Sequence, residues 1–429
     1  MKTKIAINGF GRIGRNAFKI AFERPDLEIV AVNDLTDTKT LAHLLKHDSN
    51  YGEYQHKVSS DEKNLIVEDQ SIQVLAEKDP AALPWRDLGV DVVIESTGLF
   101  VDPTKAHAHI DAGAKRVILS APAKGEGAKT VVIGVNENEL DQAGEIISNA
   151  SCTTNCITPV MAILEEHFGI EKAFMTTTHS YTASQRLQDA PAKDLREARN
   201  AATNIVPTTT GASIAAAQAL PALTNIFGGM SIRVPTPVVS LSDFAVVTKR
   251  DVTAEEVNEV FKNAAKDPYF QGILDVTEEE LVSSDFIGNS HSCIVDLNLT
   301  MVVGGNLLKV VAWYDNEWGY SNRLVELTAD VGKILNEKDG VPTEPNSNEH
   351  NGAEPQNQAD SPLGEPEKDE HSESANEPAD GEKKDEPLLE APGIGDLLPK
   401  AEEHEEHHDD SGSEPLEHND SHEHDKPLI

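Results

Sequence analysis

The sequence contains few cysteines and no long apolar run. Only three of the 429 residues are cysteine, an odd number that does not form a disulfide framework in a chain of this length. No run of about 18 apolar residues is present, so we expect no membrane-spanning helix and no membrane partner. The first residues lack an apolar run followed by a cleavage site. We therefore expect no secretory signal and a soluble protein in the reducing cytoplasm.

Basic residues are also scarce. The chain has 36 lysines and arginines against 74 aspartates and glutamates, which gives a formal net charge of −38. Residues 341–429 contribute −22 of this charge and residues 1–340 contribute −16. Neither part has the basic surplus that binds a phosphate backbone, so we expect no nucleic-acid partner.

The composition changes at about residue 341 to proline, acidic residues, histidine, serine and asparagine, without an aromatic residue or cysteine. Such a segment cannot bury enough apolar surface to offset its ordering entropy, so we predict that 341–429 is a disordered acidic tail. Its histidines lie among carboxylates and are ligands for zinc, nickel or copper, but nothing fixes their geometry. We therefore predict weak, unselective metal binding by the tail and no defined metal site. A solvated linker and a short docking motif at Leu388–Leu398 are alternative interpretations of the tail, whose partner is unknown.

A glycine motif between two apolar strands opens the chain. Lys4–Asn8 predicts a buried strand, and Gly9-Phe10-Gly11-Arg12-Ile13-Gly14 has the spacing G-x-G-x-x-G before a helix to about Phe22. A second strand, Glu28–Asn33, leads to Asp34, twenty residues beyond Gly14. These glycines let the backbone approach a pyrophosphate at the helix N-terminus, and the acid accepts hydrogen bonds from a ribose. The pattern therefore predicts dinucleotide binding.

Further apolar strands alternate with helices over residues 1–150. We predict strands at 72–75, 91–95, 116–120 and 129–134, with a helix at 102–112. This alternation is typical of a doubly wound parallel sheet, whose ligands bind beyond the carboxyl ends of the strands. Thr97 and Ser120 end two of these strands, so we expect both to line the cofactor crevice.

The pattern changes after residue 150. A strand at 173–178 leads to His179 and a long polar segment at 181–204, and such long loops are usually functional. Strands at 244–247, 293–297 and 307–313 with a helix at 253–265 indicate an α+β domain with a largely antiparallel sheet, which we place at 151–315. A final helix within 316–337 is expected to return to the first domain.

The stretch Ser151–Cys156 follows the apolar pair Ile146-Ile147 and opens a helical pattern. Cys152 would then lie at the positive end of a helix dipole, where a thiol pKa falls from about 8.5 into a range of roughly 3.5–7.5. A thiolate there is a nucleophile. The alternative is that Cys152 and Cys156, four residues apart on one helix face, are both small buried residues.

Five segments together resemble the glyceraldehyde-3-phosphate dehydrogenase family. They are Asn8–Arg15, Ser151–Cys156, Thr178–Thr182, Arg233–Pro237 and Trp313–Tyr320. The resemblance covers residues 1–337 and leaves the tail outside. It implies a Rossmann-type NAD-binding domain, a catalytic domain and a homotetramer. It further implies phosphorylating oxidation of glyceraldehyde 3-phosphate to 1,3-bisphosphoglycerate in glycolysis or gluconeogenesis, with NAD and inorganic phosphate.

The same resemblance implies roles for Cys152 and His179. Cys152 would attack the aldehyde to give a thiohemiacetal, and phosphate would cleave the thioester that follows hydride transfer. His179 would be the base that activates the thiol and helps to deprotonate the thiohemiacetal hydroxyl. Cys156 and Cys293 resemble structural residues, and Tyr320 is expected near the nicotinamide.

The predicted cofactor residues combine the motif and strand-end residues with positions carried over from the family: Gly9, Gly11, Arg12, Ile13, Gly14, Asp34, Lys78, Thr97, Ser120 and Asn316. The predicted residues for the substrate phosphate are Thr182 and Arg233. Those for the attacking phosphate are Ser151, Thr153, Thr210 and Gly211. Hydroxyls, backbone N–H groups and arginine are the donors that an oxyanion needs.

The chain departs from the family at Glu197, where many relatives carry an arginine near the attacking phosphate. A carboxylate there should weaken that site or transfer its role to a neighbour. Pro191 matches NAD-linked relatives, although Ala190 replaces a bulkier residue. One alternative is erythrose-4-phosphate dehydrogenase, which shares the cysteine and histidine but releases a free acid. The other is an enzyme with an added binding role that depends on the tail.

Overall fold

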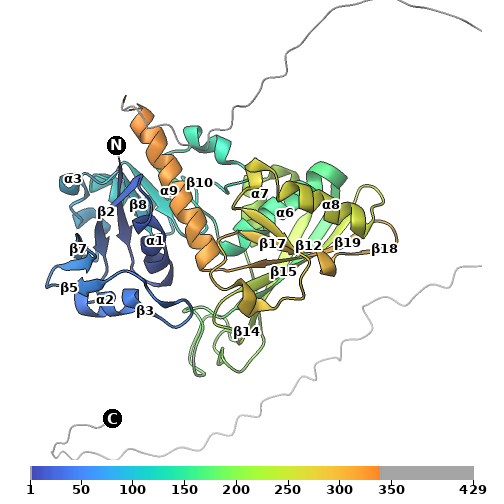
Figure 1. The fold of residues 1–429 in the computed structure, drawn as a ribbon, viewed down its shortest axis with the longest axis horizontal. Coiled ribbons are helices and arrows are strands. Elements are labelled where there is room, and N and C mark those ends of the chain that lie inside the picture. Colours follow the sequence, from blue (N-terminus) through green and yellow to red (C-terminus); the bar gives the residue numbers. More distant parts are fainter. Residues whose placement is uncertain (1, 339, 341–429) are drawn as a thin grey trace, which may run out of the picture. The chain divides into compact units, whose positions relative to one another are not determined.

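Two large β-sheets organise the part of the chain that the computed structural model describes, residues 2–338 and 340 (Figure 1). The predictions of a disordered tail, of weakly metal-binding histidines and of a docking motif at Leu388–Leu398 fall on residues 341–429. They lie outside the described residues.

The first sheet has nine strands in the order β10-β11-β9-β8-β1-β2-β7-β6-β5. Neighbours are parallel from β10 to β7, and β6 and β5 extend the sheet in antiparallel fashion. The strands are β1 (Thr3–Asn8), β2 (Leu27–Asn33), β5 (Val58–Ser60), β6 (Asn64–Val67), β7 (Gln70–Leu75), β8 (Val92–Glu95), β9 (Arg116–Leu119), β10 (Lys129–Thr130) and β11 (Ile146–Ser148). The predicted doubly wound parallel sheet is confirmed.

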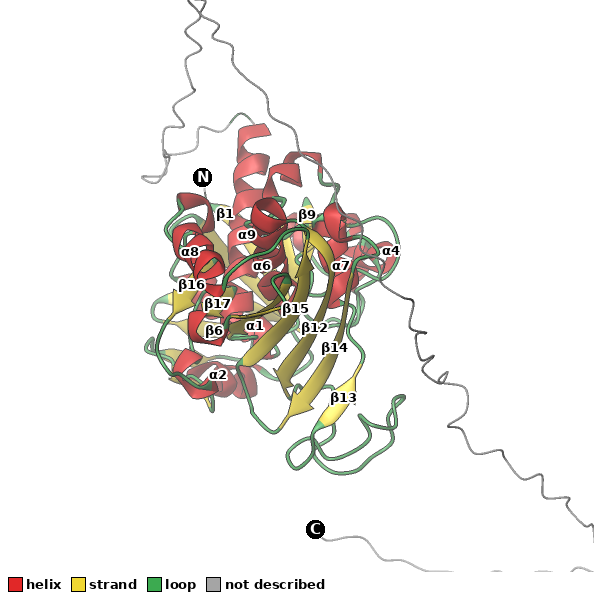
Figure 2. Cartoon of the chain, turned by 90° about the vertical axis from the view of Figure 1, so that its right-hand side faces the viewer, coloured by secondary structure: helices red, strands yellow, loops and turns green. Residues whose placement is uncertain are grey.

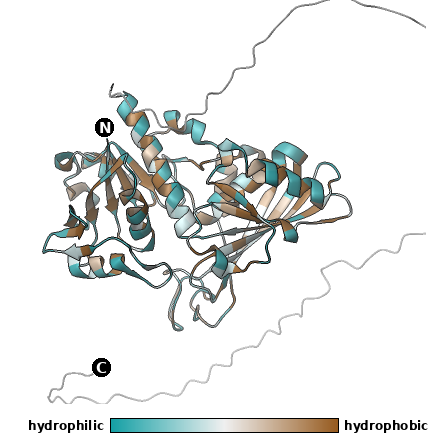
Figure 3. Cartoon of the chain, viewed as in Figure 1, coloured by the Kyte–Doolittle hydropathy of each residue, from teal (hydrophilic) through white to brown (hydrophobic). Residues whose placement is uncertain are grey.

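Helices flank this sheet and connect its strands. They are α1 (Arg12–Phe22), α2 (Thr38–Lys46), α3 (Trp85–Leu88), α4 (Pro103–Ala106) and α5 (Ala108–Asp111), and the short strands β3 (His47–Asp48) and β4 (Gly52–Glu53) pair with each other after α2. Ile5 and Ile7 of β1 pack with Phe18 of α1 and Leu324 of the last helix in one buried cluster. Figure 3 shows hydrophobic residues along the strands of both sheets. Burial of these side chains stabilises the sheet at about 1.5–3 kcal/mol for each large apolar residue.

The second sheet has eight strands and is largely antiparallel, as predicted. Its order is β13-β14-β12-β15-β19-β17-β16, with β18 paired to β19. The strands are β12 (Ile170–Ser180), β13 (Val206–Thr208), β14 (Phe227–Val234), β15 (Ser240–Thr248), β16 (Leu274–Thr277), β17 (Cys293–Asp296), β18 (Met301–Val303) and β19 (Leu307–Tyr314). Figure 2 shows β12, β14 and β15 side by side.

Three helices contribute to the buried core of the second sheet: α6 (Cys152–Phe168), α7 (Ala212–Ala219) and α8 (Ala254–Ala264). Val160 of α6 and Phe261 of α8 lie in one cluster with Met175 of β12 and Val310 of β19. Phe174, the neighbour of Met175 along β12, is half exposed because successive side chains of a strand point to opposite faces. The inward face of β12 is therefore the one that can carry functional side chains toward α6.

The last described helix, α9 (Trp318–Lys338), packs on α1, β1 and β8 of the first sheet (Figure 1). Asp315 fixes its start, because Oδ1 accepts hydrogen bonds from the backbone N–H groups of Glu317 and Trp318. This contact satisfies donors that the first turn of a helix leaves open.

The predicted strand at 129–134 is wrong beyond Thr130. There the side chain of Asn136, and not a neighbouring strand, provides the hydrogen-bond partners of the backbone. Its Oδ1 accepts a hydrogen bond from Val132 N–H, and its Nδ2 donates one to the Thr130 carbonyl. The predicted helix at 102–112 consists of two short helices, α4 and α5. The sequence also gave no indication of β14, whose two glycines, Gly228 and Gly229, are unusual in a strand.

Candidate active site

The turn between β1 and α1 requires its glycines at two positions. Gly9 has φ +93°, in the left-handed region, and a Cβ there would lie 2.7 Å from the backbone nitrogen of Thr97. A Cβ on Gly14 would lie 2.1 Å from the Gly9 carbonyl oxygen, whereas a Cβ on Gly11 would meet no atom within 4 Å. Gly9 and Gly14 are thus required by the fold itself, and Gly11 faces open space.

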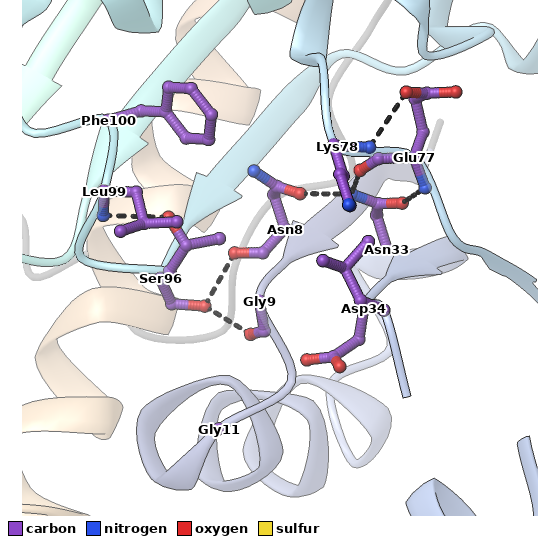
Figure 4. A pocket seen from close by; sticks show the side chains of 12 residues that line it. Asn8, Gly9, Gly11, Asn33, Asp34, Glu77, Lys78, Ser96, Leu99 and Phe100 are labelled. Atoms are coloured by element: carbon purple, nitrogen blue, oxygen red, sulfur yellow. Dashed lines mark hydrogen bonds between the residues drawn. The ribbon is translucent and has the colours of Figure 1, made fainter. Parts of the chain in front are cut away.

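A cavity of about 500 Å³ lies beyond the carboxyl ends of β1, β2 and β8 (Figure 4). We name it the strand-end cavity. Its lining comprises Asn8, Gly9, Gly11, Asn33, Asp34, Leu35, Glu77, Lys78, Ser96, Thr97, Leu99 and Phe100. Five predicted cofactor residues, Gly9, Gly11, Asp34, Lys78 and Thr97, are therefore brought together around it.

The Asp34 carboxylate faces the start of α1. Its Oδ2 accepts a hydrogen bond from Phe10 N–H at 2.8 Å, and Oδ1 accepts one from Thr36 N–H at 3.0 Å. These contacts hold the acid at the rim of the cavity beside the glycine turn.

The side chain of Arg12 is engaged elsewhere. It pairs with Asp48 at 2.6 Å and with Glu317 at 2.5 Å, and these two carboxylates raise its pKa despite partial burial.

Ser120 follows β9, and its N–H donates to the Glu95 carbonyl. Asn316 is buried and accepts a hydrogen bond from the Ser240 hydroxyl. Ile13 packs against the core of the first sheet.

Cys152 is the first residue of α6, as predicted. The Ser151 hydroxyl caps the helix by accepting a hydrogen bond from Thr154 N–H. Ala150 has φ +54°, a strained value for a residue with a side chain, and its carbonyl accepts a hydrogen bond from the buried Tyr320 hydroxyl at 2.9 Å. This turn aims the half-buried Cys152 side chain at the second sheet.

His179 lies next to Cys152 on the inward face of β12. Its Nε2 is 3.5 Å from Cys152 Sγ, and its Nδ1 is 2.7 Å from the Ser180 carbonyl oxygen. A carbonyl only accepts hydrogen bonds, so Nδ1 carries the proton and the Nε2 lone pair faces the thiol. The imidazole is therefore oriented to remove the thiol proton.

At neutral pH, burial favours the uncharged form of both side chains. Burial, reinforced by the charge of Arg233, lowers the pKa of His179 to about 3. Burial also raises the pKa of the Cys152 thiol, which outweighs the opposing effects of Arg233 and of Thr153. The predicted fall in the thiol pKa is therefore wrong for the free chain, because desolvation exceeds the effect of the helix N-terminus.

Arg233 lies beside His179, since the two residues are register partners on the parallel strands β12 and β14. Its Nη1 donates to the same Ser180 carbonyl at 3.2 Å. No carboxylate of residues 2–338 and 340 forms an ion pair with it. An unpaired guanidinium next to a thiol is suited to an anionic substrate.

The other predicted phosphate residues surround these strands. Thr182 lies two residues past the end of β12, at the same edge as Arg233, because β12 and β14 are parallel. Thr210 and Gly211 follow β13, and the Thr210 hydroxyl accepts a hydrogen bond from Ala212 N–H. The hydroxyl of Thr153 bonds to Tyr314, so that side chain is already partnered.

Glu197 lies next to β13, because its carboxylate accepts a hydrogen bond from the Thr208 hydroxyl at 2.8 Å. This contact is two residues before Thr210. The expected weakening of an anion site near Thr210 stays a prediction.

The predicted site residues did not include Asn8, Asn33 and Glu77 of the cavity wall, nor Tyr314 behind the thiol. Tyr314 bonds to both Thr153 and Thr177 and packs edge-on against His179. Asn8 and Asn33 are polar residues at the carboxyl ends of parallel strands, which was the available signal. Tyr314 had no comparable local signal.

Two features are absent from the part of the chain that the structure describes. No helix there is long and apolar enough to cross a membrane. No group of three or more histidine, cysteine or acidic side chains among residues 2–338 and 340 is placed to hold a metal ion.

Comparison with known proteins identifies similar sequences over both sheets. Residues 3–103 match the family model for the NAD binding domain of glyceraldehyde 3-phosphate dehydrogenase, and residues 151–316 match the model for its C-terminal domain. Glyceraldehyde-3-phosphate dehydrogenase of Streptomyces coelicolor is 53% identical over 337 residues, which are 78% of this chain and 100% of that protein. The enzyme of Borreliella burgdorferi is 52% identical over 77% of this chain and 100% of its own. That of Geobacillus stearothermophilus is 53% identical over 77% and 98%.

Proposed function

The chain belongs to the glyceraldehyde-3-phosphate dehydrogenase family, and from this membership we infer that it oxidises glyceraldehyde 3-phosphate with NAD and inorganic phosphate. It is an NAD-dependent oxidoreductase. The observation that carries the proposal is the approach of His179 Nε2 to Cys152 Sγ at 3.5 Å, at the start of α6.

Cys152 is the proposed nucleophile and His179 the proposed base. His179 Nε2 accepts the thiol proton as Sγ attacks the aldehyde carbon, and it passes this proton to the oxygen of the resulting alkoxide, so that a thiohemiacetal forms and Nε2 is free again. The same nitrogen then assists removal of the hydroxyl proton. NAD, when bound, supplies the acceptor for the hydride. An oxygen of inorganic phosphate attacks the acyl carbon of the resulting thioester, the C–S bond breaks, and 1,3-bisphosphoglycerate is released. The proton held on His179 Nε2 returns to the departing thiolate and restores the thiol.

The strand-end cavity fits NAD. Gly11 faces open space there, the N–H groups at the start of α1 suit a pyrophosphate, and Asp34 suits ribose hydroxyls but repels a 2′-phosphate. We assign NAD binding to Gly9, Gly11, Arg12, Ile13, Gly14, Asp34, Lys78, Thr97, Ser120 and Asn316. Arg12 and Ile13 contribute their backbone at the helix start, since the Arg12 guanidinium is held by Asp48 and Glu317.

Arg233 and Thr182 are the proposed ligands of the substrate phosphate, because the unpaired guanidinium lies beside the catalytic pair. Ser151, Thr153, Thr210 and Gly211 are the proposed ligands of the attacking phosphate. Glu197 should raise the KM for inorganic phosphate through its negative charge.

We further propose a domain division into 1–150 for NAD binding, 151–315 for catalysis and 316–337 for the C-terminal helix that returns to the first domain. A homotetramer in the cytoplasm is the proposed state. Exposed apolar side chains support assembly, since Leu187 and Leu195 of the segment after β12 are 74% and 82% exposed and Phe174 on the outer sheet face is 50% exposed.

An assay of the pure protein with NAD, glyceraldehyde 3-phosphate and inorganic phosphate tests the function. Turnover should require phosphate and should yield an acyl phosphate. Equal rates without phosphate, with release of the free acid and preference for erythrose 4-phosphate, would favour the alternative enzyme of the same fold. Equal catalytic efficiency with NAD and NADP would contradict the role of Asp34.

A further inference from the structure

A buried row of polar residues lies behind the strand-end cavity. Asn8, Asn33 and Glu95 are the last residues of β1, β2 and β8, and the register pairs Asn8 with both of the others. All three are at most 5% exposed. Behind Glu95 lie two fully buried side chains, His109 of α5 and Trp85 of α3.

The Glu95 carboxylate accepts four hydrogen bonds. Its Oε2 receives Asn8 Nδ2 at 2.5 Å and lies 3.2 Å from His109 Nε2. Its Oε1 receives the Thr97 N–H at 2.9 Å and the Thr97 hydroxyl. A carboxylate has about four acceptor positions, so this buried side chain is fully satisfied without a cationic partner.

Trp85 fixes the direction of the hydrogen bonds that His109 makes. The indole N–H can only donate, and it lies 2.9 Å from His109 Nδ1. Nδ1 is therefore an acceptor, the imidazole is neutral, and its proton sits on Nε2, which donates to Glu95. Trp85 thus donates to His109, and His109 donates to the Glu95 carboxylate.

Glu95 also fixes the groups that face the cavity. With Nδ2 held by Glu95, Asn8 turns Oδ1 toward Asn33, which donates to it at 2.7 Å. Asn33 in turn accepts from Glu77 N–H and donates to the Glu77 carbonyl. Asn8, Asn33 and Glu77 line the cavity (Figure 4), and Thr97 lines it as well. The orientation set at Glu95 therefore passes to the cavity wall.

We propose that Glu95, held by His109 and Trp85, is a positioning residue that sets the affinity for NAD without touching it. This inference rests on the proposed function in one respect, namely that the strand-end cavity holds NAD. Preorganised polar groups lower the cost of binding, because their orientation is fixed before the ligand arrives.

Glu95→Gln is the decisive substitution because it preserves the shape of the side chain and replaces one acceptor oxygen by an NH₂ donor. Its amide NH₂ must face either the Thr97 N–H or the donors of Asn8 and His109. Asn8 cannot turn over without opposing Asn33 Nδ2, and His109 cannot change tautomer without opposing the Trp85 N–H. A buried donor is left unpaired in every arrangement.

The test uses the full-length protein and measures NAD binding by calorimetry together with steady-state kinetics. Glu95→Gln should raise the Kd and the KM for NAD about 10-fold or more. The KM for glyceraldehyde 3-phosphate and the kcat at saturating NAD should stay within about 2-fold of the wild type. A Kd for NAD unchanged in the folded variant would overturn the proposal.

A pair of substitutions at His109 tests whether the contacts of His109 with Trp85 and Glu95 affect NAD binding. This pair also tests the proposal if Glu95→Gln does not fold. His109→Gln can still accept from Trp85 and donate to Glu95, so its Kd for NAD should match the wild type within about 2-fold. His109→Leu removes both contacts and should weaken NAD binding about 5-fold or more. Equal affinities of these two variants for NAD would contradict the proposal that His109 holds Glu95 in position.

Phe261→Leu is the control for general destabilisation, because Phe261 is buried in the core of the second sheet. Phe261→Leu should lower Tm about as much as Glu95→Gln does, and it should leave the Kd for NAD unchanged. A parallel loss of NAD affinity in this control would show that Glu95 acts only through stability. Failure of the wild type to bind NAD would instead refute the proposed function.

Discussion

The strand-end cavity and the Cys152–His179 pair differ in how far their polar groups are satisfied. In the cavity wall and directly behind it, the side chains of Asn8, Asn33 and Glu95 bond to one another and to neighbouring backbone groups. At the catalytic pair, the His179 Nε2 lone pair faces a neutral thiol, and the nearby Arg233 has no carboxylate partner among residues 2–338 and 340. A binding wall benefits from groups that are already fixed, whereas a reacting site needs groups that are still available.

Cys152→Ser should have the largest effect. The hydroxyl is a far weaker nucleophile, so turnover should fall by on the order of 10⁴-fold or more, while NAD binding at the separate cavity should persist. Stopped turnover with an unchanged Kd for NAD is the expected pair of measurements. Cys156 offers the matched control, since it is fully buried in the same helix. Labelling of Cys156 by iodoacetamide with retained activity would refute the assignment.

His179→Asn should reduce turnover by roughly 10²–10⁴-fold, the usual cost of losing a general base. It should also change the pH dependence of stability. The pKa of His179 is about 3 in the folded chain, so below the unfolded pKa of about 6.5 the unfolded state binds a proton that the folded state does not. Wild-type stability therefore falls as the pH drops from about 6.5 toward 3.

The substituted protein lacks this contribution. Denaturant unfolding of both proteins between pH 7 and pH 4 should show that the wild type loses more stability than His179→Asn. Parallel pH profiles would mean that the imidazole is not held neutral by burial.

Arg233→Leu should raise the KM for glyceraldehyde 3-phosphate about 10- to 100-fold, because a charge-assisted contact to the substrate is lost. The charge of Arg233 lowers the pKa of His179, so its removal should raise that pKa. A larger fraction of His179 is then protonated at a given pH, and the acid limb of kcat/KM should move to higher pH. Arg233→Lys, which keeps the charge, should show little of this pH shift.

Gly11→Ala and Gly14→Ala separate binding from folding in the same turn. A Cβ on Gly11 meets nothing within 4 Å, so that variant should keep its Tm and bind NAD about 10-fold more weakly. A Cβ on Gly14 lies 2.1 Å from the Gly9 carbonyl, which should destabilise the fold by about 1–3 kcal/mol. Thermal unfolding and NAD titration of both variants would test this contrast, and an equal Tm loss would contradict it.

Truncation after Gly340 should have the smallest effect. Every proposed site residue lies at or before Asn316, and the composition of 341–429 lacks core-forming residues. Turnover and assembly of the truncated protein should match those of the full chain. A large loss would show that the tail belongs to the working enzyme and would support a role beyond that of a solvated linker.

The glycine turn beside the cavity could be predicted from sequence more readily than the limits of the strands. The turn at Gly9–Gly14 and the strand ending before Asp34 are local patterns, since each depends on neighbours within a few residues. The loss of the strand beyond Thr130 depended on hydrogen bonds from Asn136, and the presence of β14 depended on pairing with β12 and β13. Neither feature follows from residue preference alone.

The sequence by itself determined the fold class, the helix that begins at Cys152 and the type of chemistry available to a thiol and an imidazole. Only the tertiary structure decided the protonation preferences of these groups and the direction of their hydrogen bonds. Burial favours the uncharged forms of Cys152 and His179, the Ser180 carbonyl selects the tautomer of His179, and Trp85 directs the hydrogen bond from His109 to Glu95. The physical reason is that desolvation and hydrogen-bond direction depend on atoms that are distant in the sequence.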